Sequence, residues 1–200
     1  MILYRLVALL TRPLIRVAFR PEVRGTEHLP AEGGFVLAAN HLSGFDVWAL
    51  SYALFPRPTR NMAKNQLFKR PLLGPLMWSL GGFPARSEGA VGGVVAAAAL
   101  AAGGEAVVIY PEGARRRPDR EHRPRSGAAR AALEAGVPLV PAAICGTDGW
   151  RRLCRWHVAV GPPVPLDELR GSDGPKSTRD ATRRLWSSIV ELESGLDRGR

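Results

Sequence analysis

Two side chains that could share a proton follow a strongly apolar segment of the chain. His41 and Asp46 stand in the segment Asn40-His41-Leu42-Ser43-Gly44-Phe45-Asp46, directly after the apolar run at 35–39. Residues five apart on an ideal helix lie about 140° from each other, but Ser43-Gly44 indicates non-helical backbone between them. The Asp46 carboxylate could then accept from one imidazole nitrogen and leave the other as a general base. The alternative is that His41 caps a turn and Asp46 caps a helix.

A second polar segment also follows an apolar run. It reads Tyr110-Pro111-Glu112-Gly113-Ala114-Arg115-Arg116-Arg117. Glycine permits a tight backbone turn, and an arginine guanidinium can donate two parallel hydrogen bonds to one phosphate. The segment therefore predicts an anion site. The alternative is a solvated basic loop, since Arg120, Arg123 and Arg125 continue the run.

Apolar runs and turn signals predict the elements that would carry these two segments. After a short extended segment at 21–25, strands are expected at 35–39, 106–110, 139–144 and 157–160, and helices at 47–54, 71–80, 90–102, 126–135 and 178–193. Ser126 is expected to cap the helix at 126–135 and Gly136 to end it. Strands that alternate with helices indicate an α/β fold, with helices covering a central sheet. Both polar segments would then lie at strand ends, where such folds usually place functional groups.

The composition fits one globular domain with a polyanionic partner. The 200 residues carry a net charge of +10, which favours nucleic acid, anionic lipid or a phosphorylated substrate, although a compositional bias toward Arg and Ala accounts for part of it. No signature of a nucleic-acid-binding fold is found, so no nucleic-acid partner is expected. Cys145 and Cys154 form neither a disulfide framework nor a CxxC pair, which predicts no metal site and a reducing compartment.

The first twenty residues have the pattern of an amphipathic helix at a membrane surface. Arg5, Arg12, Arg16 and Arg20 are spaced to form one basic stripe opposite a broad apolar face. Such a helix lies in the headgroup layer, and no segment reaches the roughly 18–20 apolar residues of a spanning helix. Pro13 is expected to kink it or to begin a second segment. The alternative is an ordinary helix packed on the domain.

Taken together and in order, the segments resemble a known family, the PlsC-type glycerolipid acyltransferases. The segment at 40–46 resembles the NHxxxxD block of the 1-acyl-glycerol-3-phosphate acyltransferases, and the one at 110–115 is similar to their FPEGTR block. Further similar blocks lie at 24–30, 63–68, 137–144 and 158–163. The likeness spans roughly residues 20–165, and several blocks in the right order are more specific than any one alone.

The resemblance implies a fold and a role for individual residues. The fold would be a single domain with a mixed central sheet, as in glycerol-3-phosphate acyltransferases. His41 would be the general base and Asp46 would orient it, with the acceptor oxygen attacking the acyl thioester directly. The acceptor's glycerol phosphate would be bound by the residues at Lys64, Arg86, Glu112, Gly113 and Arg115. The segment at 137–144 would shape the acyl side or the core beneath it.

The chain departs from the family pattern at several positions. Ala114 stands where a threonine is usual, and Arg116 replaces a common serine and would enlarge the cationic patch. The segment at 81–87 matches the family's G-x-I-P-V-x-R block imperfectly, with Ser87 at the place of its arginine. This departure weakens the assignment of Arg86 and of the acceptor.

The complete prediction is an enzyme at a membrane surface. An interfacial helix at 1–20, an acyltransferase domain at 21–194 and a frayed tail at 195–200 would make up the chain. The reaction would join an acyl group from acyl-CoA or acyl carrier protein to lysophosphatidic acid, giving phosphatidic acid for phospholipid biosynthesis, without a further cofactor. The enzyme would lie on the cytoplasmic face of an anionic membrane as a peripheral or monotopic protein. The alternatives are another lysophospholipid or polyol lipid as acceptor, or a non-enzymatic basic lipid-binding module.

Overall fold

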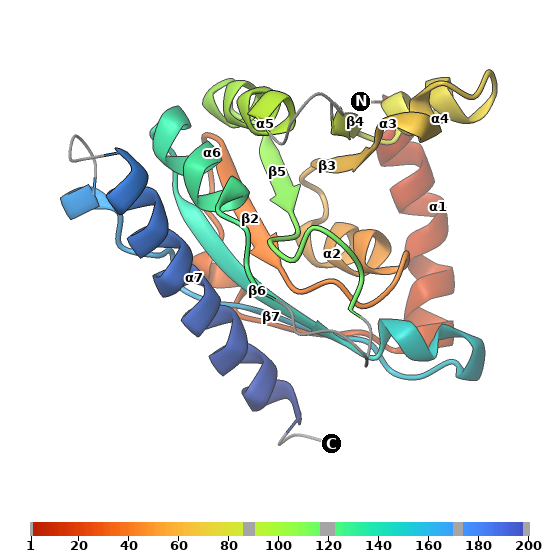
Figure 1. The fold of residues 1–200 in the computed structure, drawn as a ribbon. Helices are drawn as coiled ribbons and strands as arrows, with labels where there is room; N and C mark the ends of the chain where they lie inside the picture. Colours follow the sequence, from red (N-terminus) through yellow and green to blue (C-terminus); the bar gives the residue numbers. More distant parts are fainter. Residues whose placement is uncertain (1, 86–90, 117–122, 170–173, 198–200) are drawn as a thin grey trace.

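A computed structural model describes residues 2–85, 91–116, 123–169 and 174–197 of the chain. The centre of the fold is one sheet of seven strands in the order β1-β7-β6-β2-β5-β3-β4 (Figure 1). Neighbouring strands run parallel except for β6 and β7, which are antiparallel. The predicted α/β fold with a mixed central sheet is therefore confirmed. The strands are β1 Glu22–Arg24, β2 Phe35–Ala39, β3 Thr59–Lys64, β4 Gly82–Ala85, β5 Ala106–Ile109, β6 Leu139–Cys145 and β7 His157–Val160.

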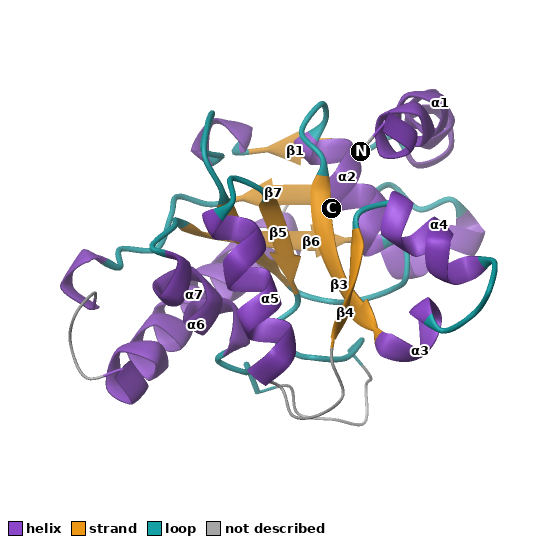
Figure 2. Ribbon diagram, turned by 90° about the horizontal axis from the view of Figure 1, so that it is seen from above, coloured by secondary structure: helices purple, strands orange, loops and turns teal. Residues whose placement is uncertain are grey.

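Helices cover both faces of this sheet, as Figures 1 and 2 show. They are α1 Ile2–Phe19, α2 Asp46–Leu54, α3 Asn65–Phe68, α4 Leu73–Ser79, α5 Val91–Ala102, α6 Gly127–Ala135 and α7 Gly174–Asp197. Alternate residues of β2 point to opposite faces, so Val36 and Ala38 meet α5, α6 and α7, while Phe35 and Leu37 meet α2 and Ile15 of α1. β2 is buried throughout, which is why its sequence is a continuous apolar run.

The sequences of β3 and β4 lack the continuous apolar run from which strands were predicted. β3 reads TRNMAK, and its Thr59 and Asn61 are buried. Its Arg60 forms an ion pair with Glu105, the residue just before the neighbouring strand β5. β4 is only four residues long and contains a proline. Their place at one end of the sheet, beside α4 and α1, is given by tertiary packing rather than by a local pattern.

The helix ends agree with the predicted ones in α6 but not in α7. Gly136, with φ +67°, ends α6 as expected, but the Ser126 side chain makes no capping bond. The tail predicted to fray from residue 195 is instead helical through Asp197, because Leu196 is buried against Ala143 and Ala159. Residues 198–200 lie outside the described part of the chain.

Helix α1 packs on the domain along one side and presents leucines on the other. It continues through Pro13 as one helix, so Pro13 does not begin a second segment. Tyr4 and Ile15 are buried, and the Phe19 ring stacks on Trp156 with centroids 4.0 Å apart. The outward side exposes Ile2, Leu3, Leu6, Leu9, Leu10, Leu14 and Val17. No helix within the described ranges has the length and apolar character needed to cross a membrane.

The predicted stripe of four arginines is wrong at one position. Arg12 turns toward the domain, where it donates to the Tyr52 carbonyl at 2.8 Å and lies over the Tyr52 and Phe55 rings. Arg5, Arg16 and Arg20 remain exposed. One side of α1 therefore packs on the domain, as the alternative interpretation expected, and the other is an exposed apolar face, so the membrane-surface interpretation stays a prediction.

Candidate active site

The His41 and Asp46 side chains form the predicted hydrogen-bonded pair. β2 ends at Ala39, a non-helical loop follows, and α2 begins with Asp46. His41 Nδ1 lies 2.7 Å from Asp46 Oδ2. The buried carboxylate oxygen also accepts from the backbone N–H groups of Leu42 at 2.7 Å and Ser43 at 3.0 Å. With the carboxylate ionised, Nδ1 donates to it and Nε2 is the nitrogen that can take a proton.

Asn40 fixes the loop that carries His41. Its buried amide donates to the Ile144 carbonyl at 2.8 Å and accepts from the Ile144 N–H at 2.7 Å. This pair of hydrogen bonds joins the His41 loop to the end of β6. The segment at 137–144 is thus core beneath the site, since β6 is buried almost throughout. From the sequence, Asn40 was only one residue of a motif, because its hydrogen-bond partner Ile144 lies 104 positions away.

Tyr110 forms one wall of the His41 site. Its ring stacks on the imidazole, with centroids 4.1 Å apart and 17° between the planes. Burial, and secondarily the nearby negative charge of Asp46, raises the pKa of the Tyr110 phenol well above its ordinary 10.0. The phenol is neutral at neutral pH, and its oxygen has no hydrogen-bond partner among the described residues. Tyr110 therefore supplies a flat, uncharged surface against which the His41 imidazole is held.

The loop after β5 is attached to His41 from both sides. Glu112 Oε1 accepts the His41 backbone N–H at 3.3 Å, and the Arg116 backbone N–H donates to the His41 carbonyl at 2.7 Å. Glu112 is buried and also accepts from Arg116 Nε at 2.9 and 3.0 Å. Glu112 is thus buried and supports the loop, and its contact with an acceptor stays a prediction.

Arg116 does not enlarge a cationic patch, which corrects the second expectation for this loop. Beyond Glu112, its guanidinium donates to both carboxylate oxygens of Glu193 in α7, at 2.7 and 3.0 Å, and lies over the Trp186 ring. These hydrogen bonds outweigh the burial of the group and raise the pKa of Arg116. Two acidic partners neutralise this arginine, whereas its neighbour Arg115 is exposed.

The other predicted binding residues lie near the same edge or outside the described part. Gly113 has φ +70°, and a side chain there would press on Arg125, so glycine suits the turn. Lys64 ends β3, which runs parallel to β5 and so brings its last residue to the edge where β2 and β5 end. Arg86 lies outside the described residues. No group of three metal-ligating side chains occurs in the part of the chain that is described.

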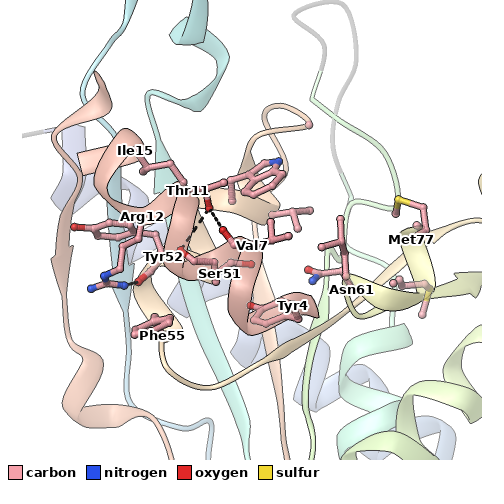
Figure 3. A pocket seen from close by; sticks show the side chains of 18 residues that line it. Tyr4, Val7, Thr11, Arg12, Ile15, Ser51, Tyr52, Phe55, Asn61 and Met77 are labelled. Carbon is pink, nitrogen blue, oxygen red and sulfur yellow. Dashed lines mark hydrogen bonds between the residues drawn. The ribbon is translucent and has the colours of Figure 1, made fainter. Parts of the chain in front are cut away.

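A mostly apolar cavity of about 240 Å³ lies beside the loop that carries His41, and Figure 3 shows side chains that line it. Its walls come from α1, α2, β3 and the α4–β4 region, and Gly44 of the loop is one of the lining residues. Three polar lining residues meet at the buried Thr59 behind the wall, where Thr59 Oγ1 lies 3.2 Å from Tyr4 Oη, 3.4 Å from Ser51 Oγ and 3.0 Å from Asn61 Nδ2. α1 therefore closes a cavity that reaches Gly44 of the His41 loop.

The chain is similar to known acyltransferases over most of its length. A family model described as Acyltransferase matches residues 20–145. The 1-acyl-sn-glycerol-3-phosphate acyltransferase of Bacillus subtilis (strain 168) is 28% identical over 199 residues, covering 98% of this chain and 99% of that protein. The Escherichia coli (strain K12) protein of the same name is 27% identical over 184 residues, covering 86% and 74%. The crystal structure of PlsC from Thermotoga maritima, named as a 1-acyl-sn-glycerophosphate (LPA) acyltransferase, has a TM-score of 0.69 at 23% identity, covering 94% of this chain and 80% of that one, which shows the shared fold.

Proposed function

The chain belongs to the acyltransferase family, and from that membership we propose that it transfers a fatty acyl group from an acyl thioester to the free hydroxyl of lysophosphatidic acid, giving phosphatidic acid. The observation that carries the proposal is the 2.7 Å hydrogen bond between His41 Nδ1 and Asp46 Oδ2 at the end of β2. A protein that only binds lipid has no need of an oriented base. The names of the relatives support lysophosphatidic acid as the acceptor.

The proposed reaction needs one base and no acyl-enzyme. His41 Nε2 takes the proton from the acceptor hydroxyl as its oxygen attacks the carbonyl carbon of the thioester. The ionised Asp46 carboxylate stabilises the imidazolium that forms. When the tetrahedral intermediate collapses, the carbon–sulfur bond breaks and the thiolate takes the proton from His41. The products are an ester and a free thiol, and the base is regenerated.

The surroundings of the pair suit the two substrates. Arg115, exposed beside the His41 loop, is proposed to bind the acceptor phosphate together with Lys64, because guanidinium and ammonium groups both pair with phosphate. The apolar cavity next to Gly44 is proposed to hold the acyl chain, since apolar walls suit methylene groups. Either acyl-CoA or acyl carrier protein is a donor compatible with this arrangement.

A thiol-release assay tests the proposal. The protein is mixed with an acyl thioester, with and without lysophosphatidic acid, and the lipid product is identified by mass spectrometry. We expect acceptor-dependent thiol release, and His41→Ala should lower kcat by about 10²–10⁴-fold, the usual loss for a general base. His28→Ala is the matched control, because His28 lies in the short helix at Thr26–His28, away from the catalytic loop.

The same assay separates the alternatives. A panel of lysophospholipid and polyol lipid acceptors shows whether another hydroxyl lipid is preferred. Near-normal turnover by His41→Ala would refute the mechanism. No thiol release with any acceptor would favour a lipid-binding module.

We propose that the protein lies peripherally on the cytoplasmic face of the membrane through the outward side of α1. The exposed leucines of α1 suit burial in the headgroup layer, while Arg5, Arg16 and Arg20 suit anionic headgroups. Three exposed arginines contribute up to roughly 3 kcal/mol at an anionic surface. The inward side of α1 closes the cavity, so membrane contact and substrate entry would lie together.

Polar substitutions on the outward side test this placement without disturbing the core. Leu10→Gln, Leu14→Gln and Val17→Gln together should weaken binding to anionic vesicles at least roughly 100-fold at any salt concentration, because each buried aliphatic side chain contributes about 1.5–3 kcal/mol. Val95→Gln is the control, since Val95 is exposed on α5 across the sheet. Unchanged sedimentation of the triple variant with vesicles would exclude α1 as the membrane contact.

A further inference from the structure

The Thr147 side chain contacts Oδ1 of the Asp46 carboxylate, whereas the donors of the His41 loop contact Oδ2. Its hydroxyl donates to Asp46 Oδ1, while Oδ2 accepts from His41 and from the Leu42 and Ser43 amides. Thr147 and Asp46 are both fully buried and lie 101 positions apart in the chain. We propose that Thr147 is a positioning residue of the reaction, the third member of a hydrogen-bonded line Thr147–Asp46–His41. This inference rests on the proposed function of the His41 pair.

The backbone around Thr147 is built to hold its hydroxyl in place. The Thr147 carbonyl accepts from Ser43 Oγ at 3.0 Å, so the catalytic loop and the segment after β6 are joined a second time at this residue. Gly146 has φ +85°, and a side chain there would overlap the Arg155 carbonyl, so the chain can turn into the helix at Thr147–Arg152 only with glycine at this position. With the Asn40–Ile144 bonds, two independent links fix β6 to the His41 loop.

The hydroxyl acts on the carboxylate in two ways. A buried carboxylate oxygen without a donor is costly, and the Thr147 hydroxyl supplies the donor for Oδ1. The bond also fixes the rotation of the carboxylate about its own axis, because Oδ1 and Oδ2 are then both held. With the plane of the carboxylate fixed, the hydrogen bond from His41 Nδ1 to Oδ2 has one direction. The orientation of the imidazole ring, and so the direction in which Nε2 points, is then fixed as well. No other side-chain donor to Oδ1 is found among the described residues.

Three substitutions at Thr147 isolate the hydroxyl. Thr147→Val keeps the volume and removes the donor, Thr147→Ser keeps the donor, and Thr147→Ala differs from the serine variant by the hydroxyl alone. We expect valine and alanine to lower kcat by about 10- to 100-fold, less than loss of the base itself, with KM for the lysolipid changed less than about threefold. Serine should restore kcat to within about threefold of the parent enzyme. Thr182→Val, which removes a hydroxyl bonded within α7, should leave kcat unchanged.

A test in the Asp46→Asn background separates positioning from general damage to the fold. If Thr147 acts through Asp46, then Thr147→Val should cost much less in Asp46→Asn than in the parent enzyme, because residues that act as one unit are not additive. An equal loss in both backgrounds would overturn the inference, as would alanine and serine variants with the same kcat. If His41→Ala were also fully active, the proposed function itself would fail. If only the Thr147 variants were fully active, the role of Thr147 would fail alone.

Discussion

Removing the Arg116 guanidinium should destabilise the domain and slow the reaction together. Arg116 connects three parts of the molecule, since it bonds the Glu112 carboxylate, the Glu193 carboxylate of α7 and, through its backbone, the His41 carbonyl. In Arg116→Ala the guanidinium bonds are lost while the backbone bond can persist. Glu112 is then a buried carboxylate that keeps the His41 N–H but loses the Arg116 guanidinium.

The size of the effect follows from the burial of the three side chains. Breaking a buried ion pair by removing one partner costs about 3–5 kcal/mol. The Glu112 side chain is 0% exposed, but Arg116 is 29% and Glu193 19% exposed, so water replaces part of the lost bonding. We therefore expect a loss of about 2–3 kcal/mol, which for a domain of this size lowers Tm by roughly 4–12 °C. Arg116→Ala should also lower kcat about tenfold, because the loop that holds His41 loses its anchor to α7.

Urea unfolding and steady-state kinetics of the same samples measure both effects. Arg130→Ala is the control, since the Arg130–Glu134 pair is 41% and 38% exposed and should contribute only about 0.3–0.5 kcal/mol. A double-mutant cycle with Glu193→Gln apportions the contribution of α7, with an expected coupling of about 0.5–2 kcal/mol. If Arg116→Ala is no less stable than Arg130→Ala, the network does not hold the loop and the reasoning is wrong.

Three further predictions concern the acceptor, the tyrosine and the cavity. Arg115→Lys keeps the charge but loses the paired donors, so the acceptor KM should rise, and more so in Arg115→Ala, with kcat changed less; an unchanged KM in Arg115→Ala would remove Arg115 from the site. Because burial raises the pKa of Tyr110 above 10.0, the unfolded chain releases this proton first, and stability should fall as pH rises above about 10, by at most about 1.4 kcal/mol per pH unit. Tyr110→Phe should abolish that part of the loss, seen as a smaller difference between urea midpoints at pH 9 and pH 11. Ala8→Phe, which projects a ring from α1 into the cavity, should shift donor preference toward shorter acyl chains in a competition between thioesters, and an unchanged preference would place the acyl chain elsewhere.

The sequence alone determined the features that depend on neighbours along the chain. The run at 35–39 is buried on both faces and is therefore apolar at every position, which identifies β2 without the rest of the sheet. His41 and Asp46 are five residues apart with a flexible Ser43-Gly44 between them, so their pairing could be expected from the loop itself. The ordered motif blocks then predicted the family, and the family match confirmed it.

Tertiary structure decided what depends on partners far away in the chain. β3 is a strand because its neighbours pair with it and its buried polar side chains bond one another, although its residues show no strand pattern. The sequence predicted that Arg116 would enlarge a cationic patch, but the guanidinium pairs with Glu193, 77 positions away. Which side of α1 packs on the domain likewise depends on a distant contact, the one between Tyr4 and Thr59. Thr147 carries no local signal at all, because a hydroxyl acquires a role only from the carboxylate that folding places beside it, and that contact is set by the sheet order that brings the ends of β2 and β6 together.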